Sequence, residues 1–223
     1  MKRILVFLMA AIMVGGLALS AQAVTVLDPD NSEMHLYQIV QNSAFGSLTG
    51  YASSQAFAAA FPVLESLPGS SGGYYVTAAY ATFASFTQDP GIYLTGSPGT
   101  MVKIGSPFPV GPDGIFSIGP KQLQPTGDFG FFDQTNYGGT KYTQLALNSD
   151  NPAQSNGLIF KISDDHFIVA FEDGGWDQPL GDGDYNDLVL NVTTASPAPI
   201  PGTVLLLGTG LLGLVGLGWR KRG

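Results

Sequence analysis

The stretch that decides the fold is HFIVAFEDGGWDQPLGDGDYNDLVLNV, residues 166–192, in which two apolar segments flank an acidic loop. Successive side chains of an extended strand point to opposite sides, so alternate residues belong to one face. The apolar residues that would share a face are Phe167, Val169 and Phe171 in the first segment and Leu188, Leu190 and Val192 in the second. We therefore expect two core strands that pair as a hairpin, with the acidic loop at its mouth.

The loop between these strands is unusual in its charge. It holds six carboxylates, with Lys161 as the nearest preceding cation. Crowded carboxylates repel unless a cation neutralises them, and Ca²⁺ takes about six to eight oxygens from carboxylates, amides and carbonyls. The oxygen-bearing residues at the two ends of the loop are the candidate calcium ligands: Glu172, Asp173, Asp182, Asp184, Asn186 and Asp187. A solvated acidic turn without a bound ion is the alternative.

The loop does not match the EF-hand, a common calcium-binding motif. An EF-hand requires Gly at the sixth position and Glu at the twelfth. Counted from Asp182, these positions hold Asp187 and Thr193. Magnesium fits less well than calcium, because it keeps several waters and rarely uses an all-protein cage.

The rest of the chain favours a mainly β fold. After residue 73, short apolar and aromatic segments alternate with Gly and Pro turns, which is typical of an antiparallel sandwich. We expect strands near residues 35–40, 74–86, 91–95, 100–104, 114–118, 128–132, 141–147, 157–162, 166–171 and 188–192. Residues 51–67 are Ala-rich and predict one short helix, which Pro62 limits. The expected fold class is an antiparallel β-sandwich or jelly roll with one short helix.

The two ends of the chain resemble export signals. Residues 1–23 combine a basic n-region, an apolar stretch and a cleavage site of small residues, which is the layout of a secretory signal peptide. Apart from Thr209, residues 204–219 are apolar or Gly, and they precede a basic cluster, which predicts a short transmembrane helix with the basic residues on the cytoplasmic side. The domain organisation that we expect is a signal peptide at 1–23, an N-terminal part with the helix at 24–90, the sandwich with the acidic loop at 91–192, a Pro/Ala/Ser linker at 193–201 and a membrane tail at 202–223.

The tail resembles the PEP-CTERM sorting signals of Gram-negative bacteria. Its matching elements are the Pro-x-Pro residues Pro199 and Pro201, the Gly/Leu-rich helix and the terminal cluster Arg220, Lys221 and Arg222. Ile200 stands where the family usually has Glu. The resemblance implies the export machinery and an exosortase-type sorting enzyme as partners. It also implies transient anchoring in the inner membrane, followed by the cell surface or extracellular matrix as the destination.

The acidic loop also resembles a family. Phe171-Glu172-Asp173 followed by Asp182-x-Asp184-Tyr185-Asn186-Asp187 and two apolar residues is similar to the "FED…DYND" signature of a bacterial surface domain of unknown function. That domain often stands beside PEP-CTERM tails. The resemblance implies a β-sandwich that binds calcium, with no established activity.

Charge and cysteine content exclude several classes of function. Between residues 24 and 196 only four lysines oppose all 17 acids of the chain, which gives a net charge of −13. Nucleic-acid binding requires cations that displace counterions from phosphate, so this class is excluded. The chain has no cysteine, which excludes thiol nucleophiles and thiolate zinc sites.

The sequence favours a non-catalytic protein with a structural or adhesive role in the extracellular matrix or a biofilm. His166 follows two aspartates, yet no G-x-S-x-G or H-E-x-x-H motif accompanies it. A glycoside hydrolase using Glu172 and Asp184 is the less favoured enzyme hypothesis. The alternative binding function is a calcium-dependent, lectin-like module that contacts extracellular polysaccharide, with Trp176 and Tyr185 as stacking groups.

Overall fold

The structure is a computed structural model that describes residues 24–29, 33–81, 87–105, 114–116, 121–135, 139–148, 155–172 and 182–194. Its helical elements are α2 (Leu36–Val40), η1 (Ser43–Phe45), α3 (Ser54–Ala60) and η2 (Leu145–Leu147). Its strands are β1 (Val63–Leu64), β2 (Tyr74–Ala81), β3 (Pro90–Leu94), β4 (Ser97–Lys103), β5 (Gly114–Phe116), β6 (Lys121–Leu123), β7 (Phe129–Thr135), β8 (Gly139–Tyr142), β9 (Gly157–Lys161), β10 (His166–Phe171) and β11 (Leu188–Thr194).

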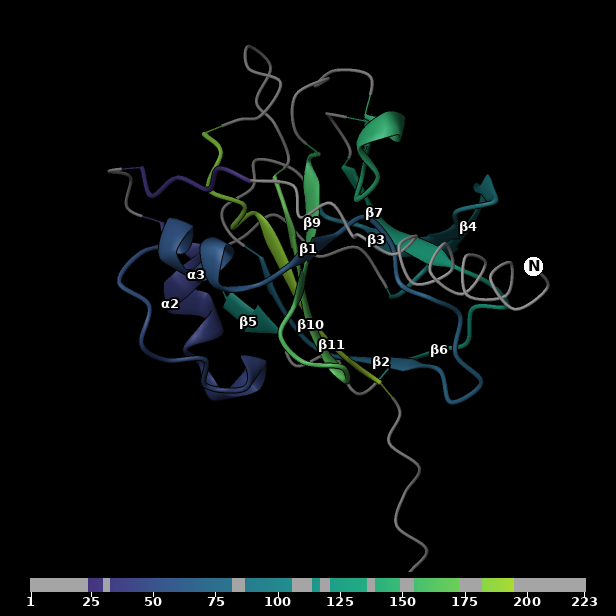
Figure 1. The fold of residues 1–223 in the computed structure, drawn as a ribbon. Coiled ribbons are helices and arrows are strands. Elements are labelled where there is room, and N and C mark those ends of the chain that lie inside the picture. Colours follow the sequence, from purple (N-terminus) through teal and green to yellow (C-terminus); the bar gives the residue numbers. More distant parts are fainter. Residues whose placement is uncertain are drawn as a thin grey trace, which may run out of the picture.

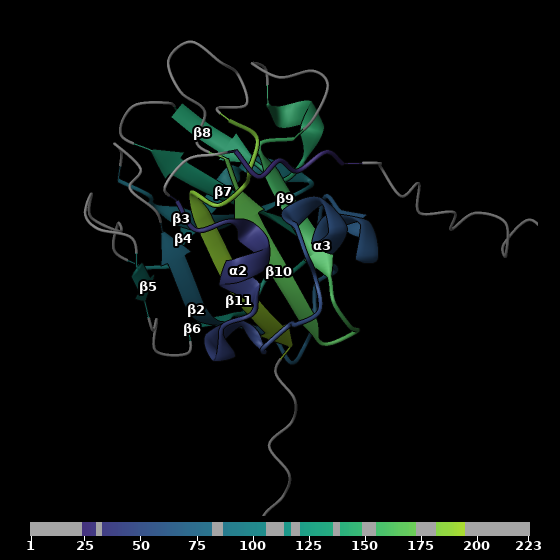
Figure 2. The same cartoon turned by 90° about the vertical axis from the view of Figure 1, so that its left-hand side faces the viewer.

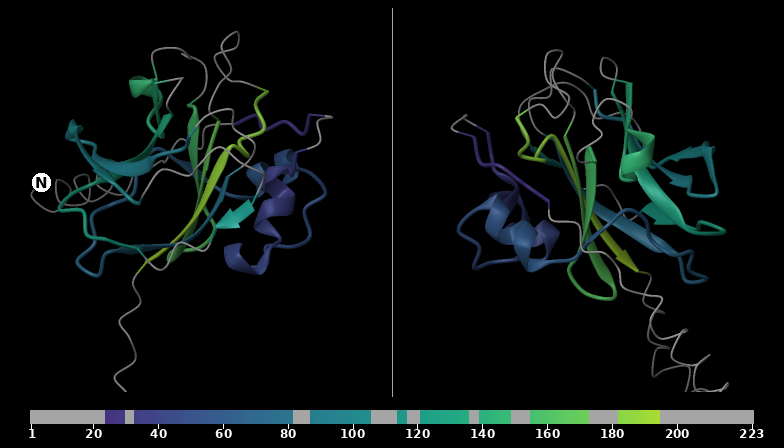
Figure 3. Two further views of the ribbon diagram at one scale, coloured as in Figure 1. Left: turned by 180° about the vertical axis from the view of Figure 1, so that it is seen from behind. Right: turned by 45° about the horizontal axis from the view of Figure 1, so that its top comes forward.

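The strands form two antiparallel sheets. The larger sheet has the order β1-β9-β10-β11-β2-β5, with β6 also paired to β2, and the smaller one has the order β4-β3-β7-β8. Figure 1 shows the smaller sheet on one side of the larger sheet and the helices α2 and α3 on the other. Figure 2 looks onto the helices, which cover β10 and β11, and Figure 3 shows the same layers from behind. The mainly β, two-sheet architecture expected from the sequence is confirmed.

The hairpin predicted from the opening stretch is present. β10 pairs antiparallel with β11, and the register joins Phe167 to Val192, Val169 to Leu190 and Phe171 to Leu188. These six residues belong to the core between the two sheets, together with Phe129 and Phe131 of the smaller sheet. The predicted division of faces is therefore confirmed.

The opposite face of the hairpin is also buried. Ile168, Ala170 and Val189 pack in a second core. Its other members come largely from the helical layer and include Leu36, Ile39, Val40, Phe45 and Phe57. The larger sheet is covered on both faces, so its central strands are apolar at nearly every position, as in sheets that lie between two layers.

Two of the expected strands are wrong. Residues 36–40 form helix α2, because Leu36, Ile39 and Val40 have the spacing of one helical face and all three are buried. The strand expected at 141–147 ends at Tyr142, and η2 follows. Asn148 holds this turn, since its Nδ2 donates to the carbonyls of Tyr142 and Gln144.

The predicted helix is present but shorter than residues 51–67. α3 begins after Ser53, whose hydroxyl accepts from the N–H of Ala56 at 3.1 Å, and it ends at Ala60, two residues before Pro62. The expected signal peptide, the linker after residue 194 and the membrane tail lie outside the described residues. None of the described helices has the length and apolar character needed to cross a bilayer.

Candidate metal site

The acidic residues lie where the central hairpin opens. Phe171 of β10 and Leu188 of β11 form the strand pair nearest the loop. Glu172 directly follows Phe171, and Asp187 directly precedes Leu188. The N–H of Glu172 donates to the carbonyl of Asn156 at 2.9 Å, which continues the pairing with the segment before β9. The sheet thus places the two ends of the loop side by side, as predicted from the sequence.

Glu172 organises the turn that precedes β11. Its Oε2 accepts from the backbone N–H groups of Gly183 at 3.0 Å, Asp184 at 3.1 Å and Tyr185 at 3.4 Å. Gly183 and Tyr185 have positive φ values of 78° and 56°, and this backbone conformation turns successive N–H groups toward one point. Glu172 is only 2% exposed, so one of its carboxylate oxygens is already committed to holding the turn.

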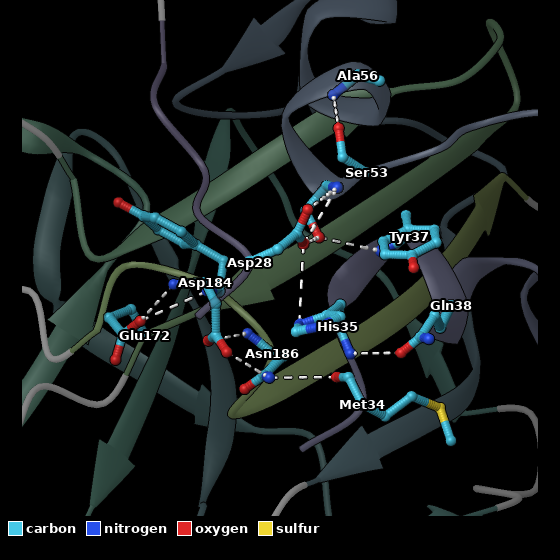
Figure 4. Close-up of polar contacts among 12 residues, drawn as sticks. Asp28, Met34, His35, Tyr37, Gln38, Ser53, Ala56, Glu172, Asp184 and Asn186 are labelled. Carbon is cyan, nitrogen blue, oxygen red and sulfur yellow. Dashed lines mark hydrogen bonds and ion pairs between the residues drawn. The ribbon is translucent and has the colours of Figure 1, made fainter. Parts of the chain in front are cut away.

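Asp184 and Asn186 form the buried centre of the cluster (Figure 4). Asp184 Oδ2 accepts from Asn186 Nδ2 at 2.6 Å, and Asp184 Oδ1 accepts from the N–H of Asn186 at 3.3 Å. The same Nδ2 donates to the carbonyl of Met34 at 3.1 Å, which fixes the orientation of the amide. Asn186 Oδ1 is buried and has no hydrogen-bond donor among the described residues. A buried amide oxygen in this state is costly unless a cation or a donor satisfies it.

A third carboxylate reaches the cluster from the N-terminal segment. Carboxylate oxygens of Glu33, Asp182 and Asp184 all lie within 4.8 Å of one another. Asp184 is buried, Glu33 is half-buried and Asp182 is exposed, so the cluster extends from the interior to the surface. Two oxygens bound to one Ca²⁺ at its usual distances lie at most about 5 Å apart. The spacing of these three carboxylates is therefore compatible with ligation of one Ca²⁺.

The electrostatics of the cluster favour a bound cation. Burial, with added repulsion from the carboxylates of Asp182 and Asp187, raises the pKa of Asp184 to about 8. Burial likewise raises the pKa of Glu172, with Asp187 and Asp184 adding to the effect. The three N–H donors on Glu172 oppose this rise, because they stabilise the ionised form. Ionising the whole cluster is thus unfavourable without a positive charge.

The six predicted ligands have different positions. The structure brings Glu172, Asp182, Asp184, Asn186 and Asp187 together, whereas Asp173 lies outside the described residues. Asp187 is half-buried beside Glu172 and contributes to its raised pKa. Sequence reasoning missed Glu33, because no local pattern connects the acidic segment at 28–33 with a loop near residue 184.

One predicted ligand-binding residue is corrected. Tyr185 is fully buried in the second core, and its hydroxyl donates to the carbonyl of Ser155 at 2.6 Å. A ring in this position has no face to offer a sugar, so the expected stacking role is wrong for Tyr185. Trp176 and the sorting residues Pro199, Pro201, Arg220, Lys221 and Arg222 lie outside the described residues.

A second polar group lies beside the site without forming a catalytic arrangement (Figure 4). The carboxylate of Asp28 accepts a hydrogen bond from the hydroxyl of Ser54, and Asp28 Oδ2 accepts one from the N–H of Ser54 at 3.0 Å. Asp28 Oδ1 lies 3.8 Å from His35 Nδ1. Serine and histidine therefore both face the carboxylate, and no hydrogen bond joins them. Ser54 is also fully buried. This group fastens the N-terminal segment to the start of α3.

Comparisons with known proteins add no further assignment. The chain matches no protein-family model, and neither a curated protein nor a solved structure is similar to it. Its function is therefore argued from its sequence and from the geometry of this site.

Proposed function

We propose that this chain is an exported, non-catalytic β-sandwich protein in which calcium braces the mouth of the central hairpin. The observation that carries the proposal is the cluster of Glu33, Asp182 and Asp184 oxygens, next to which Asn186 has a buried amide oxygen without a donor among the described residues. These residues come from two segments far apart in the chain. An ion bound to them would join the N-terminal segment to the β10–β11 loop.

The bracing role follows from the cost of the cluster without a cation. Buried like charges destabilise a fold, and their pKa values rise as a result. A divalent cation would reverse the sign of that interaction, and Asn186 Oδ1, which is buried without a donor among the described residues, is a further candidate ligand. Calcium suits the carboxylate-rich set better than magnesium does, because it accepts more oxygen ligands in irregular geometry.

The site supports a structural role better than a catalytic one. Glu172 and Asp184, the pair considered for glycoside hydrolysis, are 2% and 0% exposed. Both are engaged by backbone or amide N–H groups, which leaves no room for a sugar ring between them. His166, the other catalytic candidate, is bonded through Nε2 to Asn191 Oδ1 at 2.7 Å.

The cellular role is proposed from the sequence. The signal-like ends and the net charge of −13 between residues 24 and 196 suit a protein that works outside the cell. We place it at the cell surface or in the extracellular matrix of a Gram-negative bacterium, with a structural or adhesive function. Extracellular calcium modules bind at about 10⁻⁴ to 10⁻³ M, so such a brace would be filled by environmental calcium.

The test is thermal unfolding of the full chain with and without calcium. Calcium at about 100 times its Kd adds roughly 2.7 kcal/mol to the free energy of unfolding, so the Tm should rise with calcium and fall with a chelator. Magnesium at the same concentration is the ionic control and should give a smaller rise.

Three variants locate the response. Asp184→Asn and Glu33→Gln should each abolish most of the calcium-dependent rise in Tm. Asp164→Asn removes the same charge from a fully exposed side chain that pairs with Lys161, and it should keep the whole response. A Tm that calcium leaves unchanged in the wild-type chain would refute the brace, and a response retained in Asp184→Asn would move the ligands elsewhere.

A further inference from the structure

A groove opens on the side of the sandwich where both sheets end. It has a volume of about 290 Å³ and lies between β3 and β4 of the smaller sheet and β6 of the larger one. Its apolar lining comes from Ile92, Leu94, Val102 and Leu123. Ile92 and Leu123 are members of the core between the sheets, and Leu94 packs against it. The floor of the groove is therefore the open edge of the hydrophobic core.

The strands that border the groove are edge strands. Among the described residues, β4 pairs with β3 alone and β6 pairs with β2 alone. β4 is exposed along most of its length, with Val102 55% and Met101 37% exposed. Exposed apolar residues on an edge strand promote aggregation, and in native proteins they often mark a binding site.

The groove also collects positive charge in an otherwise acidic domain. Two of the four lysines between residues 24 and 196, Lys103 and Lys121, line it. Of the other two, Lys141 is buried in β8 and Lys161 pairs with Asp164 at 2.7 Å. Lys103 pairs with Asp89, whereas Lys121 is exposed and has no ion pair within the part of the chain that the structure describes.

We propose that this groove binds a small amphipathic carboxylate, a compact apolar body with one negative charge. The apolar body would cover Ile92, Leu94, Val102 and Leu123, and the carboxylate would meet the ammonium group of Lys121 at the rim. The volume is close to the lower limit of ordinary ligand pockets, which suits a ligand of about ten carbon atoms. Gln122 and Gln124 also line the groove.

The charge of the domain selects against larger anions. A net charge of −13 repels a polyanion along its whole length, whereas one carboxylate in contact with a lysine is attracted locally. At physiological salt the repulsion from charges beyond about 8 Å is largely screened. For a small ligand, the attraction between its one carboxylate and Lys121 therefore outweighs the repulsion from the net charge of the domain. For a polyanion, the repulsion is larger than this attraction.

The groove is independent of the calcium site. β6 pairs with Tyr74–Val76 at the start of β2, whereas Ala81 at its end pairs with Leu188 beside the acidic loop. At about 3.3 Å per residue, the five residues from Val76 to Ala81 separate the two places by roughly 17 Å. Ligand binding in the groove is therefore expected to be the same with calcium and with a chelator.

The experiment is calorimetric titration of the full chain with 4-phenylbutyrate. The neutral match is 4-phenylbutanol, which has the same body without the charge. Wild-type protein should bind the carboxylate at least about tenfold more tightly than the alcohol, the difference expected for one charge-assisted contact. Binding that is absent, or equal for the two compounds, overturns the proposal.

Two lysine variants test the position of the site. Lys121→Gln should weaken 4-phenylbutyrate binding about tenfold and leave 4-phenylbutanol binding unchanged. Lys161→Gln changes the net charge equally at a residue outside the groove, and it should bind both compounds as wild type does. The wild-type chain and both variants contain the apolar segment at 204–219, so any binding of the two compounds to that segment is the same in all three proteins. Equal affinities of Lys121→Gln and Lys161→Gln for the carboxylate would overturn the assignment.

A third variant tests the apolar floor. Val102→Asp places a carboxylate at an exposed position of the groove and should abolish binding of 4-phenylbutyrate while the calcium-dependent Tm is kept. Retained binding would contradict the proposal. A lost calcium response with intact ligand binding would instead contradict the proposed calcium brace alone.

Discussion

The middle of β11 and the turn before it accommodate buried polar groups in different ways. In the middle of the strand, Asn191 bonds to His166, to the carbonyl of Ala44 at 2.7 Å and to the hydroxyl of Thr77 at 3.1 Å. Asn191 Nδ2 is used as a donor, so Asn191 Oδ1 accepts and the proton lies on His166 Nε2. In the turn before the strand, Asp184 and Asn186 belong to a cluster of like charges that keeps one buried amide oxygen without a donor among the described residues.

The difference concerns what each cluster needs from outside the chain. The Asn191 network is built of neutral donors and acceptors that satisfy one another, and it fastens the η1 turn to the larger sheet. A β-bulge in β2 beside Asn191 brings Thr77 into reach. The Asp184 cluster has an excess of acceptors and of negative charge, which a bound cation would balance. The Asn191 network should therefore be insensitive to calcium, and the Asp184 cluster should depend on it.

The largest expected effect is the loss of the neutral network. Asn191→Ala removes three hydrogen bonds and leaves the half-buried carbonyl of Ala44 without its donor. We expect a loss of about 3 kcal/mol in the free energy of unfolding, equal with calcium and with a chelator. Urea unfolding in both conditions measures it. A loss that depends on calcium would mean that the Asn191 network and the Asp184 cluster are coupled.

A smaller effect is expected at Glu172, and it separates charge from hydrogen bonding. Glu172→Ala leaves the three N–H groups of the turn without their acceptor and should cost about 2 kcal/mol. Glu172→Gln keeps a carbonyl acceptor and removes the repulsion with Asp187. In metal-free protein it should be neutral or slightly stabilising. Equal losses in the two variants would show that the charge of Glu172 is required.

The last expected effect is a pH dependence of stability that calcium reduces. The folded-state pKa of Asp184, about 8, lies above that of an unfolded carboxyl group. Folded protein therefore retains a proton that the unfolded chain releases. In the metal-free protein this contribution is complete below about pH 4 and is lost as the pH rises through about 8.

The pH dependence is measured by urea unfolding of metal-free protein between pH 5 and pH 8. We expect the free energy of unfolding to decrease throughout this range, because the folded-state pKa of Asp184 lies at its upper end. Calcium should reduce this decrease, because it replaces the proton as the neutralising charge. Asp184→Asn should make the profile shallower, with the remaining slope coming from Glu172, whose pKa is also raised, whereas Asp164→Asn should keep the wild-type profile. A stability that rises with pH in metal-free protein would contradict the account of the cluster.

The sequence by itself determined the centre of the fold. The alternation in 166–171 and 188–192 predicted the two faces of the hairpin and the position of the acidic loop, because apolar residues two apart can be buried together only in a strand. The Gly and Pro residues that separate short apolar segments after residue 73 predicted the mainly β class. These features depend on local patterns that one strand carries alone.

Only the tertiary structure decided the rest. Residues 36–40 are apolar enough for a strand, yet they form a helix because the outer face of the larger sheet needs a cover with helical spacing. Tyr185 has the composition of a ligand-binding residue and is instead a core residue, since the turn held by Glu172 directs its ring inward. Glu33 joins Asp182 and Asp184 only after the N-terminal segment packs against the hairpin. Such contacts between distant segments depend on how the layers pack, which no local pattern of residues specifies.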